Sequence, residues 1–404
     1  MGDKMAPMGR RSAITRVLAG TAALLVAAAV WAPLLHLFYV PGPEDGPAPD
    51  GVPARARMLA EYHLQLWGDK SLRIGQILAM RESNAEWDFM GRTFLACALA
   101  NMALRQEARK EEALGALDTI IDETLRLEAE EGMYHFLMPY ARYKPFVVDP
   151  PRSLFIDGEI ALVLAHRLAV AGKPRYREAL GERIDLIVDR MERGPVLSAE
   201  SYPDECWTFC NTVALGAVAM ADRILGEDHG AFLESWVATA RKKLVDPGTG
   251  LLVSSYTYEG KPLDGPEGSS IWMAASMLRF VDEAFAEDQY RRAEKELRGS
   301  LFGFGYAREW PASWKGPADI DSGPVIPVLG ASPGSSGLAL LGAASFGDTD
   351  YARELMTSLE LAAFPSVEKG RLRYHASNLV GDAVLLYALL QGPVWRKLEK
   401  GEKR

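Results

Sequence analysis

Two carboxylate residues, Asp157 and Glu159, interrupt the apolar segment LFIDGEIALVLA, where burial of an unpaired charge is costly. Two more, Asp319 and Asp321, lie in the Gly- and Pro-rich segment PADIDSGPVIPVLGASPGSSG, which is too long and too apolar for a simple turn. Loops of this kind often cover a functional cavity. Because an apolar cavity raises the pKa of a carboxyl group, Glu159, Asp319 and Asp321 are candidates for acid/base catalysis.

A second unusual segment, SYPDECWTFCNTV at residues 201–213, carries Cys206 and Cys210. The two thiols would share one face if a helix began by Cys206. A metal site is disfavoured, because no histidine and no second cysteine pair lie nearby. A disulfide across one helical turn is geometrically awkward. We therefore expect Cys210 to be unbridged to Cys206, and inert burial of both thiols is the simplest interpretation.

Two kinds of helical segment alternate along the chain and would position these residues. The first kind is rich in Ala, Gly, Ser and Leu and is apolar almost all round, so it should be buried on all sides. It is predicted at 87–104, 154–170, 207–225, 269–285, 332–347 and 378–392. The second kind has one charged face and is predicted at 54–68, 109–127, 176–193, 229–244, 287–301 and 349–364. Short strands are predicted at 196–202, 251–258 and 370–376.

Six buried helices alternating with six amphipathic ones predict an all-α fold, an (α/α)6 toroid whose inner helices surround a cavity. A generic helical bundle or solenoid is the alternative. In a toroid the segments that lead into the inner helices converge on one end of the cavity, and these segments carry carboxylates. Capping of helix N-termini explains any single one of these carboxylates equally well. The substrate-binding candidates at this end are Trp87, Asp157, Asp204, Trp207, Tyr258 and Trp272.

The composition is that of a globular chain with no basic face for nucleic acid. Of its 404 residues 48% are apolar, which suffices for a sizeable core, and the net charge is −9. Three cysteines do not make a disulfide framework. The expected partners are a small-molecule substrate and a membrane, without nucleic acid or a metal, and a homo-oligomer is compatible with the sequence.

An apolar segment at 17–40 predicts a transmembrane anchor. Lys4, Arg10, Arg11 and Arg16 precede it, and it runs for 24 residues without a formal charge. At about 1.5 Å per residue this length crosses a hydrocarbon layer of roughly 30 Å. The basic flank predicts a cytoplasmic N-terminus, and hence a single-pass inner-membrane protein with its body in the periplasm or cell exterior. A cleaved signal peptide is the alternative.

The other boundaries follow from composition. A basic segment at 1–16 precedes the anchor, and residues 41–53, PGPEDGPAPDGVP, form a linker because Pro and Gly exclude a helix and little is apolar. The barrel is predicted over 54–396 and a charged tail over 397–404.

Residues 206–260 contain a Cys–Asn pair after Pro and Asp, a DP turn after the outer helix and an SY strand. With FIDGEIALVLAHRLAVAGKPRYREA upstream and RLRYHASNLVGDAVLLYALLQG downstream, these features resemble the bacterial linalool dehydratase/isomerase family over about residues 150–400. The resemblance implies an (α/α)6 barrel that binds a terpene alcohol in its central cavity. It also implies hydration, dehydration and isomerisation without a cofactor, through acid/base residues and cysteines.

Carried over by position, the resemblance places the family's second cysteine on Cys210. The family's first cysteine falls on Ser201, and the histidine of the preceding inner helix falls on Glu159. A hydroxyl and a carboxylate thus replace a thiol and an imidazole, so terpene alcohol dehydration does not carry over directly. The family's N-terminal carboxylate matches no position here. The catalytic candidates are Glu159, Asp321, Cys210 and Asp319.

The expected function is that of a membrane-anchored lyase or isomerase of the hydro-lyase type. One residue would protonate a leaving hydroxyl while another removes a proton from carbon. A carbohydrate-active enzyme is the first alternative, because many (α/α)6 toroids act on sugars with two carboxylates. The aromatic residues that would suit sugar stacking are Trp87, Trp207, Tyr256, Tyr258, Trp310 and Trp314. A non-catalytic periplasmic scaffold is the second alternative.

Overall fold

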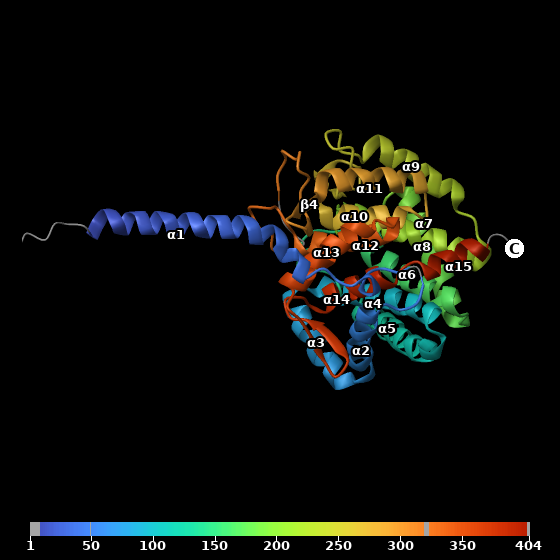
Figure 1. Cartoon of the computed structure of the whole chain (residues 1–404). Helices are drawn as coiled ribbons and strands as arrows, with labels where there is room; N and C mark the ends of the chain where they lie inside the picture. The colour runs from blue at the N-terminus through green and yellow to red at the C-terminus, as the bar shows by residue number, and fades with distance from the viewer. Residues whose placement is uncertain (1–8, 49, 319–322, 402–404) are drawn as a thin grey trace, which may run out of the picture.

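The computed structural model describes residues 9–48, 50–318 and 323–401, and the body of the chain is a ring of helices inside a second helical layer (Figure 1). The inner ring consists of α4 (Ala85–Arg105), α6 (Leu154–Val170), α8 (Thr208–Ala221), α10 (Gly268–Leu278), α12 (Pro333–Phe346) and α14 (Leu379–Leu390). Each inner helix packs against the next, and α14 packs against α4, which closes the ring. The predicted (α/α)6 toroid is therefore confirmed.

Small residues let the inner helices approach each other closely. Every residue of α6 and of α8 is buried, as expected for helices that are apolar almost all round. A methyl group at Gly158 of α6 would lie 3.1 Å from the Cβ of Ala214 of α8. A larger side chain at this position would push the two helices apart, so glycine sets the spacing directly beside Glu159.

The outer layer consists of α2 (Ala54–Gly68), α5 (Lys110–Glu131), α7 (Pro174–Arg193), α9 (Gly230–Lys243), α11 (Glu283–Leu297) and α13 (Thr349–Ala362). Each buries one face, as Leu180, Ile184 and Ile187 of α7 do at helical spacing. Two helices were not predicted, α3 (Lys70–Ser83) and α15 (Pro393–Gly401). Because α15 packs on α4 and α6, the body extends past the predicted boundary at residue 396.

Short strands precede four of the inner helices and therefore lie at the N-terminal end of the ring. One sheet joins β1 (Cys206–Trp207), β2 (Ser255–Tyr256) and β3 (Pro262–Asp264). Two hairpins are formed by β4 (Arg298–Leu301) with β5 (Phe304–Ala307) and by β6 (Pro365–Glu368) with β7 (Arg371–Tyr374). The predicted strand at 370–376 is confirmed as β7, and the one at 251–258 is reduced to β2.

The predicted strand at 196–202 is wrong, because its backbone pairs with a side chain. The amide nitrogen of Ala199 donates to Asn211 Oδ1 at 3.1 Å, and Asn211 Nδ2 donates to the Ala199 carbonyl at 3.2 Å. Leu197 also adopts a left-handed φ of 55°, which interrupts any extended run. Asn211 of α8 thus replaces a neighbouring strand.

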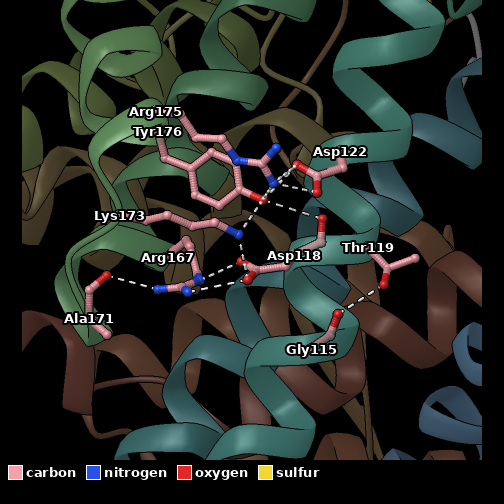
Figure 2. Close-up of polar contacts among 9 residues, drawn as sticks. All are labelled: Gly115, Asp118, Thr119, Asp122, Arg167, Ala171, Lys173, Arg175 and Tyr176. Atoms are coloured by element: carbon pink, nitrogen blue, oxygen red, sulfur yellow. Dashed lines mark hydrogen bonds and ion pairs between the residues drawn. The ribbon is translucent and has the colours of Figure 1, made fainter.

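Figure 2 shows polar contacts that fix α5 to the turn between α6 and α7. Arg167 Nε lies 2.6 Å from Asp118 Oδ1, and Lys173 Nζ lies 2.8 Å from Asp118 Oδ2. The Tyr176 hydroxyl donates to Asp122 at 2.7 Å. Burial alone would raise the pKa of Asp118, but hydrogen bonds and positive charge from Arg167 and Lys173 outweigh it, so this pKa is lowered.

Replacing Asp118 by Asn is expected to lower the free energy of unfolding by about 1–3 kcal/mol, because charge-assisted hydrogen bonds are lost. Since the folded-state pKa is lowered, the ion pairs stabilise the native chain above the unfolded pKa, and this stabilisation is lost as pH falls through the folded pKa. Urea unfolding should therefore separate variant and native chain at pH 7 and not at strongly acidic pH. Asp189→Asn is the control, since its pair with Arg193 is half-exposed. Equal losses in both variants would contradict the prediction.

The N-terminal segment leaves the body as a single long helix. Helix α1 (Gly9–Trp31) continues into the 3-10 helix η1 (Ala32–Phe38) and projects away from the ring (Figure 1). The span Ile14–Phe38 has 25 residues and a mean hydropathy of 2.0, and none of its most apolar 18-residue stretch is buried in the body. Thr208–Gly226 is also long and apolar enough to cross a membrane, but it is mostly buried in the ring. An N-terminal apolar helix with the character of an anchor or signal sequence is thus present.

Candidate active site

Glu159 lies in the second turn of α6, and its side chain is fully buried near the N-terminal end of the ring. Thr93 of α4 donates its hydroxyl to Glu159 Oε2 at 2.6 Å. The pKa of Glu159 is raised to about 8, mainly because of burial and with a smaller contribution from the charge of Glu86, while the Thr93 hydrogen bond acts in the opposite direction. Glu159 is therefore mostly protonated at neutral pH and can donate a proton.

Cys210 lies in the first turn of α8 and is buried. The Ser201 hydroxyl hydrogen-bonds its thiol, which lowers its pKa. Burial and the charges of Glu159 and Glu86 have the larger effect, and they raise the pKa of Cys210 well above its ordinary value. The thiol of Cys210 is thus neutral at physiological pH, and it is not a nucleophile because only the thiolate form attacks.

Two hydrogen bonds to the backbone of Ser201 fix the position of this residue. Ser153 Oγ donates to the Ser201 carbonyl at 2.6 Å, and the Ser201 amide donates to the Glu205 carbonyl at 2.8 Å. These contacts join the start of α6 to the turn before β1, so the hydroxyl beside Cys210 has a fixed position. The structure thus brings together Glu159, Cys210 and Ser201, three positions that are far apart in the sequence.

Glu86 contributes a second carboxylate from the first turn of α4, where it is half-buried. Tyr202 donates its hydroxyl to Glu86 Oε1, and the Met138 amide donates to the same hydroxyl at 2.9 Å. Tyr140 stacks on Tyr202 with ring centroids 4.4 Å apart. Burial and the charge of Glu86 raise the pKa of Tyr202, so the phenol remains a donor to the carboxylate.

A small cavity lies beside Glu159, between α4, α5 and α6. Its volume is about 20 Å³, and Phe89, Thr93, Ile121 and Val163 are among its lining residues. This volume has room for about one water molecule. The apolar lining explains why the carboxyl group of Glu159 is costly to ionise.

Asp157 does not share the environment of Glu159. Its carboxylate accepts from Arg152 Nε at 2.9 Å and from Arg183 Nη1 at 2.5 Å, and Arg183 also reaches Glu128 at 2.7 Å. These partners come from α7, α5 and the segment before α6. Asp157 therefore forms ion pairs towards the outer helical layer and does not point towards Glu159.

Asp204, Tyr258 and Trp207 lie together at the sheet β1–β2–β3. Asp204 has a left-handed φ of 53°, and its carboxylate accepts from the Tyr258 amide at 3.0 Å. The indole Nε1 of Trp207 is buried and has no hydrogen-bond partner in the described part of the chain. The backbone amide of Trp207 donates to Ser201 Oγ at 3.4 Å, so the indole Nε1 of the same residue lies close to the site.

The other predicted residues are spread more widely. Trp272 is fully buried between Tyr290 of α11 and Tyr351 of α13, with centroids 5.7 and 5.9 Å away, so it packs towards the outer layer. Trp87 is half-buried in the first turn of α4. Asp319 and Asp321 lie outside the described residues.

The three cysteines of the chain, Cys97, Cys206 and Cys210, are buried and free. Cys206 belongs to β1 and lies opposite Tyr256, because α8 begins only at Thr208. The two thiols of the CWTFC segment therefore do not share a helical face. Burial and the charge of Glu159 raise the pKa of Cys97, which places this thiol near the carboxyl group as well.

One group of described side chains could hold a metal ion, and it lies at the other end of the ring. Ligand atoms of Asp222, Glu227 and His229 lie within 4.8 Å of one another beside a cavity of about 500 Å³. His229 Nδ1 lies 2.6 Å from Asp222 Oδ1, and the His229 amide donates to Asp222 Oδ2 at 2.9 Å. These two bonds hold the turn after α8, where the helix has a π-helical end.

Comparison with known families and structures agrees with this architecture. The family profile described as linalool dehydratase/isomerase matches residues 155–380. The structure is similar to that of a GH76 alpha-mannanase from Bacteroides thetaiotaomicron, with 12% identity, a TM-score of 0.50, and coverage of 77% of this chain and 87% of that one.

Two other solved structures have lower scores. A family 105 glycoside hydrolase from C. acetobutylicum has 15% identity, a TM-score of 0.45, and coverage of 83% of this chain and 99% of that one. A D-mannose isomerase has 12% identity, a TM-score of 0.41, and coverage of 76% and 86%. At 12% identity the likeness to the GH76 alpha-mannanase speaks for the fold alone.

Proposed function

The chain belongs to the linalool dehydratase/isomerase family, and from this premise we propose that it is a membrane-anchored lyase or isomerase that works by acid/base chemistry. Its substrate would be a small alcohol or terpenoid held at the N-terminal end of the inner ring. The observation that carries the proposal is Glu159, a buried carboxyl group whose pKa is raised to about 8. Two observations therefore support a catalytic role: the chain belongs to a family of enzymes, and Glu159 is a buried carboxyl group that can give up a proton near neutral pH.

The proposed step moves protons only. Glu159 gives its proton to the hydroxyl of the substrate, the carbon–oxygen bond breaks, and water leaves. A base removes a proton from the adjacent carbon, and the electrons of that carbon–hydrogen bond form the double bond. Glu86 is our candidate for the base, because its carboxylate is half-buried, interacts electrostatically with Glu159 and is positioned by Tyr202.

The remaining groups would orient the substrate. Ser201 and the Cys210 thiol form a polar pair beside the acid, and the free indole Nε1 of Trp207 offers a donor nearby. Glu159 stands where the family resemblance places a histidine. A neutral carboxylic acid and an imidazolium can both give a proton to a leaving hydroxyl, so this difference preserves acid catalysis while changing its pH range.

A substrate screen tests the proposal. The full chain, purified in detergent, is incubated with terpene alcohols and simpler allylic or tertiary alcohols, and alkene products are measured by gas chromatography with mass spectrometry. Alkene formation by the native chain and its loss in Glu159→Gln would support the proposal. A folded chain that turns over no alcohol would overturn it.

A carbohydrate-active enzyme is the second candidate, and one observation favours it. Trp310 and Trp314 stack with centroids 5.6 Å apart in the segment that leads into α12. Stacked indoles at the mouth of a toroid suit a sugar ring as well as a terpenoid. Release of reducing sugar from uronic-acid or neutral oligosaccharides, dependent on Glu159, would favour this candidate over the first.

The topology yields its own prediction. Because basic residues precede the apolar span, a reporter fused after Arg404 that works only in the cytoplasm should give no signal. The same reporter fused before Met1 is the control and should give a strong signal. The chain should also stay with the membrane at full length, as an uncleaved anchor requires. A strong cytoplasmic signal from the C-terminal fusion would refute this orientation.

A further inference from the structure

The apolar N-terminal span meets the body at the end of the ring that carries Glu159. A methyl group at Gly303, in the turn of the β4–β5 hairpin, would lie 2.5 Å from the ring of His36. Phe304 of the same hairpin has its ring 6.3 Å from His36 and 6.1 Å from Tyr39. Since His36 is still within the span that ends at Phe38, the tip of this hairpin lies level with the end of the span.

Exposed apolar side chains of the body are confined to this end. In the described part of the chain beyond Val40, each large exposed apolar residue lies between an outer helix and the next inner helix. Those that lead into α12 and α14 are Leu301, Phe302, Ile326, Val328, Phe364 and Val367. Val328 is 94% exposed. The segments that run from an inner to an outer helix hold none within the described ranges.

This asymmetry is more than scattered surface hydrophobicity. Single exposed apolar residues are normal on a soluble protein, but a set gathered on one face marks an interaction surface. Figure 1 shows the β4 hairpin and α3 on the side from which α1 projects, whereas α15 and the C-terminus lie on the far side. The apolar end of the ring and the apolar span thus face the same way.

The connection between span and body is held along the barrel. Arg105, at the C-terminal end of α4, donates to the Ala48 carbonyl at 2.7 Å and to the Gly51 carbonyl at 2.9 Å. Asp45 lies 3.6 Å from Arg55 of α2. With η1 packed on the hairpin and the linker fixed at two further points, the body has a defined orientation relative to α1.

We propose that the N-terminal end of the inner ring rests on the surface of the bilayer that α1 crosses, with the hairpin tips at headgroup level. This inference rests on the membrane anchoring proposed above and adds the orientation of the body. Apolar side chains inserted at the boundary between headgroups and acyl chains stabilise such contacts. Because Glu159 lies in the second turn of α6, near this end of the ring, the proposed site is then on the membrane side of the body.

Lipid-dependent quenching tests the orientation on the full chain in nanodiscs that hold one copy each. A cysteine is introduced at Leu301 or Val367 and labelled with a polarity-sensitive fluorophore, and the lipids carry a nitroxide on the headgroup. Glu107, an exposed residue of η3 (Glu107–Arg109) at the opposite end of the ring, is the control position. The three native cysteines are buried, so the unmutated chain measures background labelling.

We expect the labels at positions 301 and 367 to lose most of their fluorescence and the label at 107 to lose little. If the chain enters nanodiscs but all three positions are quenched alike, or none is, the orientation is overturned while the anchor stands. If the chain does not enter nanodiscs, both the anchor and the orientation fail. If the labels at 301 and 367 report an apolar environment in a second preparation with two copies per disc but not in the one-copy discs, a second chain and not lipid covers this face, and the orientation is overturned.

Discussion

Replacing Glu159 by Gln is expected to lower turnover by about 10²–10⁴-fold, the range usual for a general acid. The amide keeps the shape of the side chain and removes the proton that the mechanism requires. Because burial raises the pKa of Glu159 to about 8, the native activity should be level at neutral pH and fall as pH rises through about 8. The pH profile of kcat/KM checks this directly.

Stability should change in the opposite direction, which separates a catalytic from a structural role. A carboxyl group with a raised folded-state pKa stabilises the fold below its unfolded pKa, and this contribution is lost as pH rises through the folded pKa. Glu159→Gln has no such loss, so at pH 9 the variant should be more stable than the native chain and still inactive.

Asp382 provides a matched control for this experiment. It is a second buried carboxyl group at the start of an inner helix, and burial raises the pKa of Asp382 to about 7. The groups that influence it are Ser377 and Arg373, not the residues around Glu159. Asp382→Asn should therefore keep turnover within a few-fold of native. Comparable losses in both variants, or full activity in Glu159→Gln, would remove Glu159 from the mechanism.

Asp157→Asn should cost stability instead of activity. Its carboxylate is buried against Arg152 and Arg183, and removing one partner of a buried ion pair typically costs 3–5 kcal/mol. Since Arg183 retains Glu128, we expect about 3 kcal/mol, at the lower end of that range. Urea unfolding of the variant checks the stability, and the KM measured below the transition checks substrate binding.

The control is Glu287→Gln, which breaks an exposed pair with Arg291 on α11 and should change stability by less than about 0.5 kcal/mol. A raised KM with unchanged stability would restore Asp157 as a substrate contact. The sequence prediction grouped Asp157 with Glu159, and this measurement separates them.

Helical periodicity alone predicts that Asp157 and Glu159 lie in different environments. At 3.6 residues per turn, residues two apart on α6 point to nearly opposite sides, so Asp157 and Glu159 could not share one environment. The sequence does not say which of the two faces the ring, because α6 is apolar almost all round. Only the arginines of α7 and of the segment before α6 decide it.

The inner helices could be predicted from composition, because helices that are buried on all sides need no polar face. The partners of the site could not, because they come from remote positions. Thr93 bonds Glu159 across 66 residues, and Tyr202 bonds Glu86 across 116 residues. The sequence around Thr93 and around Tyr202 gives no indication of these contacts. Glu86 at the start of α4 is one of several carboxylates at or just before the starts of inner helices, and capping alone could explain each of them.

The strand predicted at 196–202 failed for a related reason. A short segment of mixed polar and apolar residues can indicate extended backbone, but it does not say what receives its hydrogen bonds. Here the amide of Asn211 receives and donates them. A side chain of a following helix can replace a strand, and local sequence patterns do not reveal it.

The closure of the ring sets the order in which the chain can fold. Arg105 of α4 donates to the Gln391 carbonyl, 286 residues away, at 2.7 Å, and α14 is the last inner helix to be synthesised. Until then α4 has one apolar side without its neighbour, throughout the synthesis of the whole body. Such contacts between distant parts of a chain form late and leave apolar surface uncovered meanwhile. We therefore expect a chain that stops before Leu379 to leave apolar surface on α4 and α12 uncovered, and to be bound by chaperones or degraded by proteases instead of forming a stable partial barrel.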